Sequence, residues 1–495
     1  MAAKSHVLSR RPDRATGGSA DRSAAAPWQW TATEAARAVR DGEARSLDLV
    51  TAALGRVATL DPMLGAFITV NPDAERDAAA ADRAVDADRR LGPLHGIPVA
   101  IKDLAATKGL RTTYGCARFA DHVPDADDLC VARLRRAGAV ILGKTNTPEF
   151  GFGAVCANRL HGPTCNPFDP SRTSGGSSGG SAVAVATGMA MLAHGTDFGG
   201  SVRTPASFCG VVGLRPTPGR IPEPANPPGM NRLSTHGILA RTVDDVALMF
   251  EVMAGPDGGD PASMGVPAWR RPGYVRRTET VERVAFTADL GGFAPVDDEV
   301  AQVVQDAVQA IAANGWSVAE CRPEVEGVRE AFQTLRAAVL DRQYGALLED
   351  GTSDLTDSFV WNVARGKGLL ARDYLAAEEA RSDILRAFSA LFRSFDILAL
   401  PAAGVLPFAN ADGDVRSING RPLANIIDYL AVTFAISLVG FPAISIPCGH
   451  SSAGLPIGLQ LVAPPFKETR LLHFAKTLQD NLGFRHRWPP LIGQG

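Results

Sequence analysis

The segment that most constrains this chain is the stretch from Gly175 to Pro205, which reads GGSSGGSAVAVATGMAMLAHGTDFGGSVRTP. It begins with a Gly/Ser loop, continues through small apolar residues over 182–191 that predict a closely packed helix, and ends in a second Gly-rich turn. Glycine lets a backbone approach a ligand closely, and consecutive N–H groups in a turn can converge on an anion. We therefore expect an acyl-transfer site in which backbone N–H groups from Phe198 to Ser201 stabilise an oxyanion.

Lysine is rare in this chain, which has seven lysines among its 50 basic residues. A retained lysine is a candidate for a task that arginine cannot perform, the loss of a proton. Lys102 ends the apolar run GIPVAIKD at 96–103, which predicts a short buried strand. Burial lowers the pKa of a lysine by up to about 3–5 units. Lys102 is therefore suited to act as the base that a serine nucleophile needs.

The whole segment from 175 to 205 resembles the motif of the amidase signature family, including GGSSGG, the D-x-G step and the closing S-V-R-x-P. The runs GIPVAIKD, GKTNTPEFG (143–151), GFPAISIPCG and GLPIGLQLV are similar to further parts of that family. The likeness covers most of residues 27–495. It is weakest over 290–425, where the family varies its substrate pocket.

The resemblance implies the reacting residues one by one. The nucleophile maps to Ser201, the lysine base to Lys102, and the relay serine, which follows a cis peptide bond in the family, to Ser177. The spacings agree with the family motif, with 24 residues between the serines and 75 from the lysine to Ser177. Oxyanion or substrate contacts are implied for a further set: Phe198, Gly199, Gly200, Gly151 and Phe152. The chemistry requires neither a metal nor a cofactor.

The expected reaction is hydrolysis of an amide C–N bond through an acyl-enzyme on Ser201, with esters and carbamates as further substrates. Four aromatic residues lie near the expected pocket strands and are consistent with a small apolar or aryl substrate, although a place in the core is the more ordinary role for each: Tyr114, Phe119, Phe150 and Phe152. Many members of the family are homodimers, which makes a homodimer the assembly that the resemblance implies.

Other functions stay open at this point. The glutaminase (A) subunit of a tRNA-dependent amidotransferase resembles the chain in the same region, but it carries an acid shortly before the segment that matches GFPAISIP. Residues 430–439 hold no acid here, and Asp428 lies just outside them. An inactive relative is disfavoured by the intact Lys102, Ser177 and Ser201.

Two short motifs are disfavoured as sites. Gly138 to Thr145 matches the phosphate-loop pattern G-x-x-x-x-G-K-T, but its middle residues, Ala-Val-Ile-Leu, favour a strand over a flexible loop. Residues 175–179 match G-x-S-x-G, yet the loop-like residues before them lack the strand that a nucleophile elbow needs.

Strand and helix signals alternate to about residue 219, which indicates an α/β fold. The resemblance implies one large domain over 27–495, with a central mixed β-sheet flanked by helices. We expect a mostly helical stretch over 300–392 that caps the site, and strands near 395–400, 443–447 and 458–462. Residues 221–232 read as a loop. Residues 1–26 predict a disordered tail, because no apolar stretch follows the pair Arg10–Arg11.

Composition excludes several partner classes. The formal net charge is −3 and no basic stripe stands out, so we expect no nucleic acid. The sequence contains no run of about 18 apolar residues, so it predicts no membrane span. We expect a cytoplasmic enzyme with a small-molecule amide substrate. The seven cysteines form no CxxC pair and predict buried free thiols. The nine histidines show no H-E-x-x-H spacing and predict structural roles rather than a metal site.

Overall fold

The computed structural model describes residues 25–87, 89–153, 155–224, 233–266, 280–425 and 427–494. Most of the predicted tail over 1–26 and of the predicted loop over 221–232 lies outside these ranges. Within them, eleven strands form one sheet in the order β1 (Phe67–Val70), β3 (Val140–Thr145), β2 (Pro98–Lys102), β6 (Leu192–Asp197), β8 (Thr235–Ala240), β7 (Val212–Arg215), β14 (Ala443–His450), β15 (Pro456–Val462), β11 (Ile397–Pro401), β9 (Arg283–Phe286) and β10 (Ser317–Glu320).

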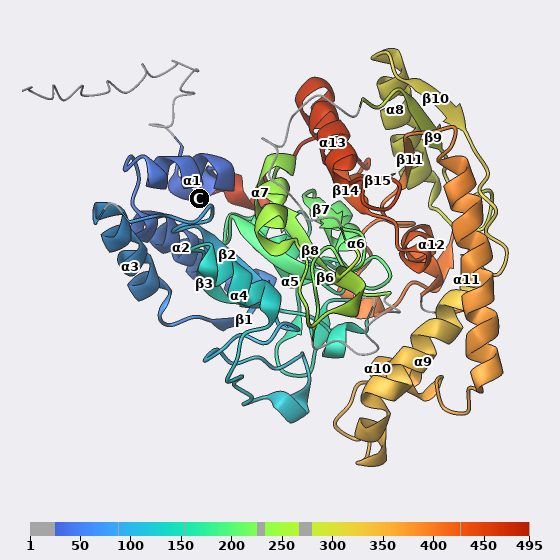
Figure 1. Ribbon diagram of the computed structural model, residues 1–495, viewed down its shortest axis with the longest axis horizontal. Helices are drawn as coiled ribbons and strands as arrows, with labels where there is room; N and C mark the ends of the chain where they lie inside the picture. Colours follow the sequence, from blue (N-terminus) through green and yellow to red (C-terminus); the bar gives the residue numbers. More distant parts are fainter. Residues whose placement is uncertain are drawn as a thin grey trace, which may run out of the picture.

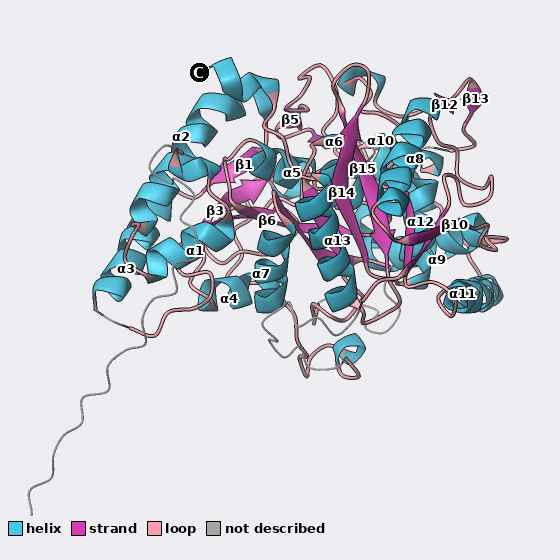
Figure 2. Cartoon of the chain, turned by 90° about the horizontal axis from the view of Figure 1, so that it is seen from above, coloured by secondary structure: helices cyan, strands magenta, loops and turns pink. Residues whose placement is uncertain are grey.

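The sheet is mixed, as predicted. Strands β3, β2 and β6 run parallel to one another, and so do β11, β9 and β10. The strands between these two groups pair antiparallel. Every residue of β2, β3 and β15 is buried, because helices cover the sheet on both sides (Figure 2).

Alternate residues of each strand face two different cores. Val99 and Ile101 of β2 belong to one core, whereas Ala100 belongs to the other. The first core packs against α1 (Ala32–Arg40), α4 (Leu129–Arg136), α7 (Val243–Met253), α8 (Asp298–Ala313) and α13 (Glu468–Leu482). The opposite face carries α2 (Ser46–Leu64), α3 (Ala74–Asp86), α5 (Gly179–Ala186), α6 (Arg203–Phe208) and α12 (Ala431–Val439).

Besides most of α8, the stretch predicted to be helical contains three further helices, α9 (Val328–Glu349), α10 (Asp357–Ala364) and α11 (Ala371–Leu391). Figure 1 shows them in yellow to orange at one end of the molecule. The prediction missed β10, which lies inside this stretch and pairs with β9 at the edge of the main sheet. Its four residues are mostly exposed, so the strand carries little apolar signal.

The predicted helix over 182–191 is shorter in the structure, and the predicted strand within 138–145 is present. The helix expected over 182–191 runs from Gly179 to Ala186 and ends before Gly188, whose positive φ of 75° is left-handed. The apolar residues that follow lead into β6 rather than extending the helix. The phosphate-loop match at 138–145 is largely strand β3, as its apolar middle predicts.

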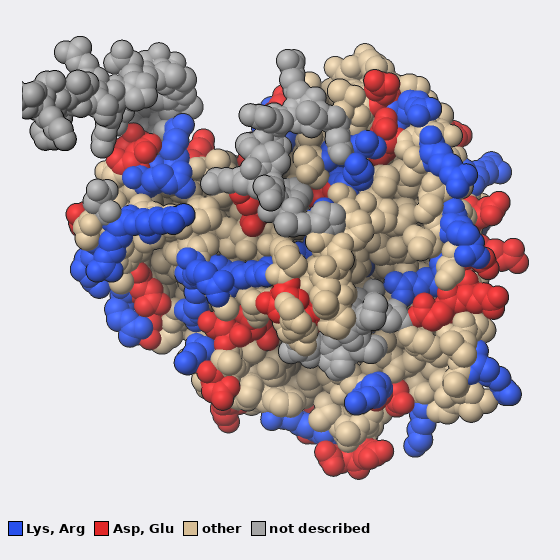
Figure 3. All heavy atoms as spheres, in the orientation of Figure 1, with Lys and Arg blue, Asp and Glu red and all other residues tan. Residues whose placement is uncertain are grey.

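On the face shown in Figure 3, basic and acidic side chains are interspersed. None of the described helices combines the length and the apolar character needed to cross a bilayer.

Candidate active site

Lys102 lies at the end of β2 and is completely buried. Its Nζ lies 2.6 Å from Ser177 Oγ, 2.9 Å from Thr196 Oγ1 and 3.0 Å from Ser178 Oγ. No carboxylate of the described residues forms an ion pair with it. Burial lowers the pKa of Lys102 to about 7, although the more distant Cys156 and Asp197 oppose this shift. A lysine in this state can hold or release a proton near neutral pH.

Ser177 lies in the Gly/Ser loop before α5, and the peptide bond between Gly176 and Ser177 is cis, as the family resemblance implies. The backbone N–H of Ser178 donates to the carbonyl of Ser201 at 3.0 Å. This bond ties the loop that carries Ser177 to the turn that carries Ser201. The two serines, 24 residues apart, therefore line the same cavity.

Asp197 shapes the turn that ends at Ser201. Its carboxylate accepts hydrogen bonds from the N–H groups of Gly200 at 2.9 Å and Val202 at 3.1 Å, and from Arg203 Nη2 at 2.8 Å. Burial alone would raise the pKa of Asp197, but the guanidinium groups of Arg203 and Arg215 outweigh it and hold that pKa below its ordinary value. A permanently ionised Asp197 fixes the backbone of the turn.

The N–H groups of Phe198, Gly199 and Ser201 make no hydrogen bond to any described residue. They border the cavity and are available to an oxyanion. The prediction for Gly200 needs correction, because its N–H is already engaged by Asp197. Gly200 has a φ of 130°, and a Cβ there would lie 2.3 Å from Thr433 Oγ1, so this position requires glycine for the path of the chain.

The cavity beside Ser177 and Ser201 has a volume of about 520 Å³. Gly151, Phe152 and Phe198, for which the sequence predicts oxyanion or substrate contacts, line it together with Phe150. It is also lined by α9 residues that the sequence did not reveal: Val339, Leu340, Gln343 and Tyr344. Tyr114 and Phe119 do not line it. They pack against Phe150, with ring centroids 6.4 and 6.0 Å away, and so support the wall from behind.

A second cavity, of about 50 Å³, also borders Ser201. It shares Gly151, Phe152, Phe198 and Ser201 with the larger one. Its remaining walls come from α9, α10 and the start of α12, with Phe332, Arg336, Asn362 and Phe434 among them. Ser201 thus lines both cavities.

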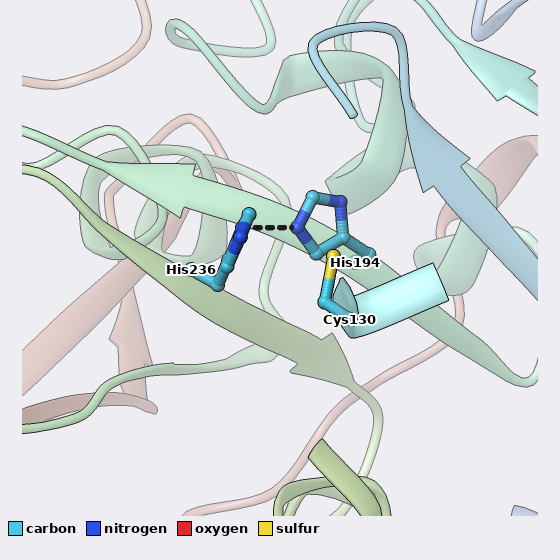
Figure 4. Close-up of side chains that lie close together, drawn as sticks. All are labelled: Cys130, His194 and His236. Atoms are coloured by element: carbon cyan, nitrogen blue, oxygen red, sulfur yellow. Dashed lines mark hydrogen bonds between the residues drawn. The ribbon is translucent and has the colours of Figure 1, made fainter. Parts of the chain in front are cut away.

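Cys130, His194 and His236 form the one group in the described part of the chain that offers three metal-ligand atoms close together (Figure 4). They come from α4, β6 and β8, and these are residue types that zinc prefers. However, His194 Nε2 and His236 Nδ1 lie 2.9 Å apart and hydrogen bond directly, while His194 Nδ1 has no partner. A zinc-bound histidine normally donates its other N–H, so the group fits a buried imidazole pair better than a metal centre.

A sequence model of the family Amidase matches residues 48–472. The chain is 34% identical to an acylamidase of Rhodococcus erythropolis, over 91% of this chain and 94% of that protein. It is 35% identical to the A subunit of a glutamyl-tRNA(Gln) amidotransferase from Synechococcus sp. (strain RCC307), over 88% and 94%.

The fold is also similar to a solved structure. A bacterial aryl acylamidase of the amidase signature enzymes superimposes with a TM-score of 0.85 at 26% identity. The match covers 91% of this chain and 96% of that one, so the two folds agree over nearly their whole length.

Proposed function

The chain belongs to the amidase family and hydrolyses amide bonds, and we propose that it acts without a partner subunit on small aryl or apolar amides, with Ser201 as nucleophile. The observation that carries the proposal is the 2.6 Å hydrogen bond between Lys102 and Ser177 in the wall of the cavity that Ser201 also lines. Esters and carbamates present a similar carbonyl group and are proposed as further substrates.

The proton relay begins with neutral Lys102. Lys102 accepts the Ser177 hydroxyl proton while Ser177 accepts the proton of Ser201, so that the Ser201 oxygen can attack the substrate carbonyl carbon. A lysine whose pKa is about 7 is half neutral at pH 7, which suits it to act as a general base there. Neither the Ser201 nor the Ser177 hydroxyl is taken up by a carboxylate of the described residues.

The oxyanion that forms on the carbonyl oxygen is proposed to accept hydrogen bonds from the N–H groups of Phe198, Gly199 and Ser201. When the C–N bond breaks, Ser177 donates a proton to the leaving nitrogen and recovers one from the Lys102 ammonium. Water then attacks the acyl-enzyme with the same relay acting in the same order, and Ser201 is released as the free hydroxyl.

The substrate class rests on the walls of the larger cavity. Four aromatic residues, Phe150, Phe152, Phe198 and Tyr344, line that space together with Ser201. Flat apolar groups pack favourably against such rings. The names of two similar proteins, an acylamidase and an aryl acylamidase, are consistent with this choice.

A glutaminase subunit is the second candidate, because the chain is as similar to the amidotransferase A subunits as to the acylamidase. Such a subunit would need an acid near the start of α12 to receive the amino group of glutamine. Residues 430–439 provide none, and Leu430 lines the smaller cavity there. Asp428 is paired with Arg329 at 2.9 Å, which leaves it committed to a structural ion pair.

The test is an assay of the purified chain alone on acetyl 4-nitroanilide, an aliphatic amide, an aryl carbamate and L-glutamine. We expect turnover of the nitroanilide and the carbamate, and its loss in S201A. Turnover of glutamine alone, or activity only with a partner subunit, would favour the glutaminase. Activity that survives in S201A would overturn the assignment of the nucleophile.

A further inference from the structure

Arg336, on α9, is a buried cation in the wall of the smaller cavity. Its guanidinium group lies over the ring of Phe152, 5.7 Å from the centroid, and Phe152 also lines both cavities. Nη2 donates a hydrogen bond to Asn362 Oδ1. No carboxylate among the described residues forms an ion pair with Arg336, which separates it from the other fully enclosed guanidinium groups near the site.

Arg203 and Arg215 provide the contrast. Both are buried, and both contact the carboxylate of Asp197, at 2.8 and 3.3 Å. A buried charge is costly unless an opposite charge compensates for it. Burial, with a smaller contribution from Arg365, lowers the pKa of Arg336 to about 9, so the group is still protonated at neutral pH. Arg336 is a cation whose counter-charge is absent from the described chain.

The surroundings of Arg336 hold it in a fixed orientation. Asn362 Nδ2 donates to the carbonyl of Ser358 at 2.7 Å, which leaves its oxygen aimed at Arg336. Asn362 and Ser358 both lie on α10, and this helix is anchored to the loop after β3. The backbone N–H and Oγ1 of Thr356, at the start of α10, donate hydrogen bonds to the Glu149 carboxylate at 2.8 and 2.7 Å. The guanidinium group is therefore held in place before any ligand binds, as in an anion-binding site.

We propose that the smaller cavity binds a carboxylate of the substrate through Arg336, so that the preferred substrates are amides that carry a short acidic arm. This inference rests on the proposed function, because it places the reacting bond at Ser201 between the two cavities. The aryl or apolar part occupies the larger cavity, and the acidic arm enters the smaller one. A guanidinium group is suited to this role because it pairs with a carboxylate through two parallel hydrogen bonds.

The acid can belong to either half of the amide, and two matched substrate pairs distinguish these cases. Succinyl 4-nitroanilide is compared with butanoyl 4-nitroanilide, and benzoylglycine with N-ethylbenzamide, so that in each acidic substrate the aryl group and the acid lie on opposite sides of the amide. We expect the wild type to show a kcat/KM about 10- to 100-fold higher for the acidic member of one pair, the gain typical of a hydrogen-bonded charge pair. R336Q should lose this preference while it retains turnover of the neutral member, and R336K should keep part of it.

R342Q serves as the matched control, because Arg342 lies on the same helix and is exposed. It should leave the preference unchanged. Binding of succinate, measured by calorimetry on folded wild type, R336K and R336Q, provides a readout that does not depend on turnover. If succinate binds to the wild type but not to R336Q, the carboxylate site is supported even when no amide is hydrolysed. In that case the proposed function is wrong, but the carboxylate site is not. If the neutral amides are hydrolysed through Ser201 but neither acid is preferred and succinate does not bind, the carboxylate site is wrong and the hydrolase stands.

Discussion

Lys102 and Lys144 lie on the neighbouring parallel strands β2 and β3, and both side chains are completely inaccessible to solvent. Within the described part of the chain, Lys102 hydrogen bonds only to hydroxyl groups, those of Ser177, Ser178 and Thr196. Lys144 instead donates to the carbonyl of Ala105 and to the hydroxyls of Thr107 and Thr112, and it lies 3.8 Å from a carboxylate oxygen of Asp103.

The difference shows that burial alone does not make a lysine a base. Burial lowers the pKa of both residues, to about 7 for Lys102 and about 8 for Lys144, with Asp103 opposing the shift at Lys144. Lys144 is enclosed by groups that stabilise its ammonium form, and neither it nor any of its hydrogen-bond partners lines the cavity. Lys102 is linked to the cavity through Ser177, which lines it. We therefore propose that Lys102, and not Lys144, receives the proton of the nucleophile.

The largest expected effect separates the two lysines by activity. K102M should lower kcat by a factor of about 10³ or more, because it removes the proposed general base. Its kcat should be close to that of S201A, and the double variant should be little worse than either, since residues that act as one unit give non-additive losses. Single-turnover assays with acetyl 4-nitroanilide at pH 7 provide the measurement. Near-normal turnover by folded K102M would show that the relay is misassigned.

The next effect separates them by stability. K144M should lower the free energy of unfolding by about 3 kcal/mol, because Asp103 loses its buried cationic partner. Urea unfolding followed by circular dichroism gives this value. The double variant K144M/D103N should recover part of the loss, since the carboxylate is then absent. K102M should change stability by less than about 1 kcal/mol, because no buried carboxylate is left unpaired. If K102M and K144M lose the same free energy of unfolding, the two lysines do not differ in their contribution to stability.

The third effect is the pH dependence of the reaction. Because Lys102 acts when it is neutral, kcat/KM should rise about tenfold per pH unit below pH 7 and level off above it. The folded-state pKa lies below the ordinary value of 10.5, so the folded protein should also gain stability as the pH rises from about 7 to 10.5. A pH–rate profile of the wild type and of T112V, which alters only the surroundings of Lys144, tests the assignment. If the rising limb of the pH–rate profile shifts in T112V, the limb reports Lys144 and its assignment to Lys102 is wrong.

Much of the fold was predictable because its signals are local. Lys102 ends an apolar run of the right length for a buried strand. Similar apolar runs form the strands β3, β11, β14 and β15. Strand β10 was missed, since an exposed edge strand of four residues has almost no apolar pattern. The early end of α5 was missed because its small apolar residues continue past Gly188 without a change in composition.

The site was predictable where a contiguous motif carries it and not where the fold assembles it. Ser177 and Ser201 lie within one segment, whereas Arg336 and Tyr344 lie at ordinary helical positions of α9 and gain their meaning from packing. The Cys130–His194–His236 group unites three elements that are far apart in the sequence. Ser178 and Thr196 were missed for a different reason. They are inside the motif, but no spacing in the sequence shows that their hydroxyls converge on Lys102.

The smallest expected effect compares the hydroxyl of Ser178 with its counterpart at Lys144. Ser178 Oγ lies 3.0 Å from Lys102 Nζ and also donates to the carbonyl of Thr196 at 3.2 Å. S178A should lower stability by about 1 kcal/mol, the usual cost of a lost hydrogen bond, and lower kcat by about tenfold because Lys102 is held less firmly toward Ser177. T112V removes one of the hydroxyls at Lys144 and should cost about the same stability with no change in kcat. Unfolding curves and kcat values for the two variants are compared side by side. If S178A leaves kcat unchanged while its stability falls, the hydroxyls around Lys102 serve the fold just as those around Lys144 do. The distinction between the two lysines would then rest on Ser177 alone.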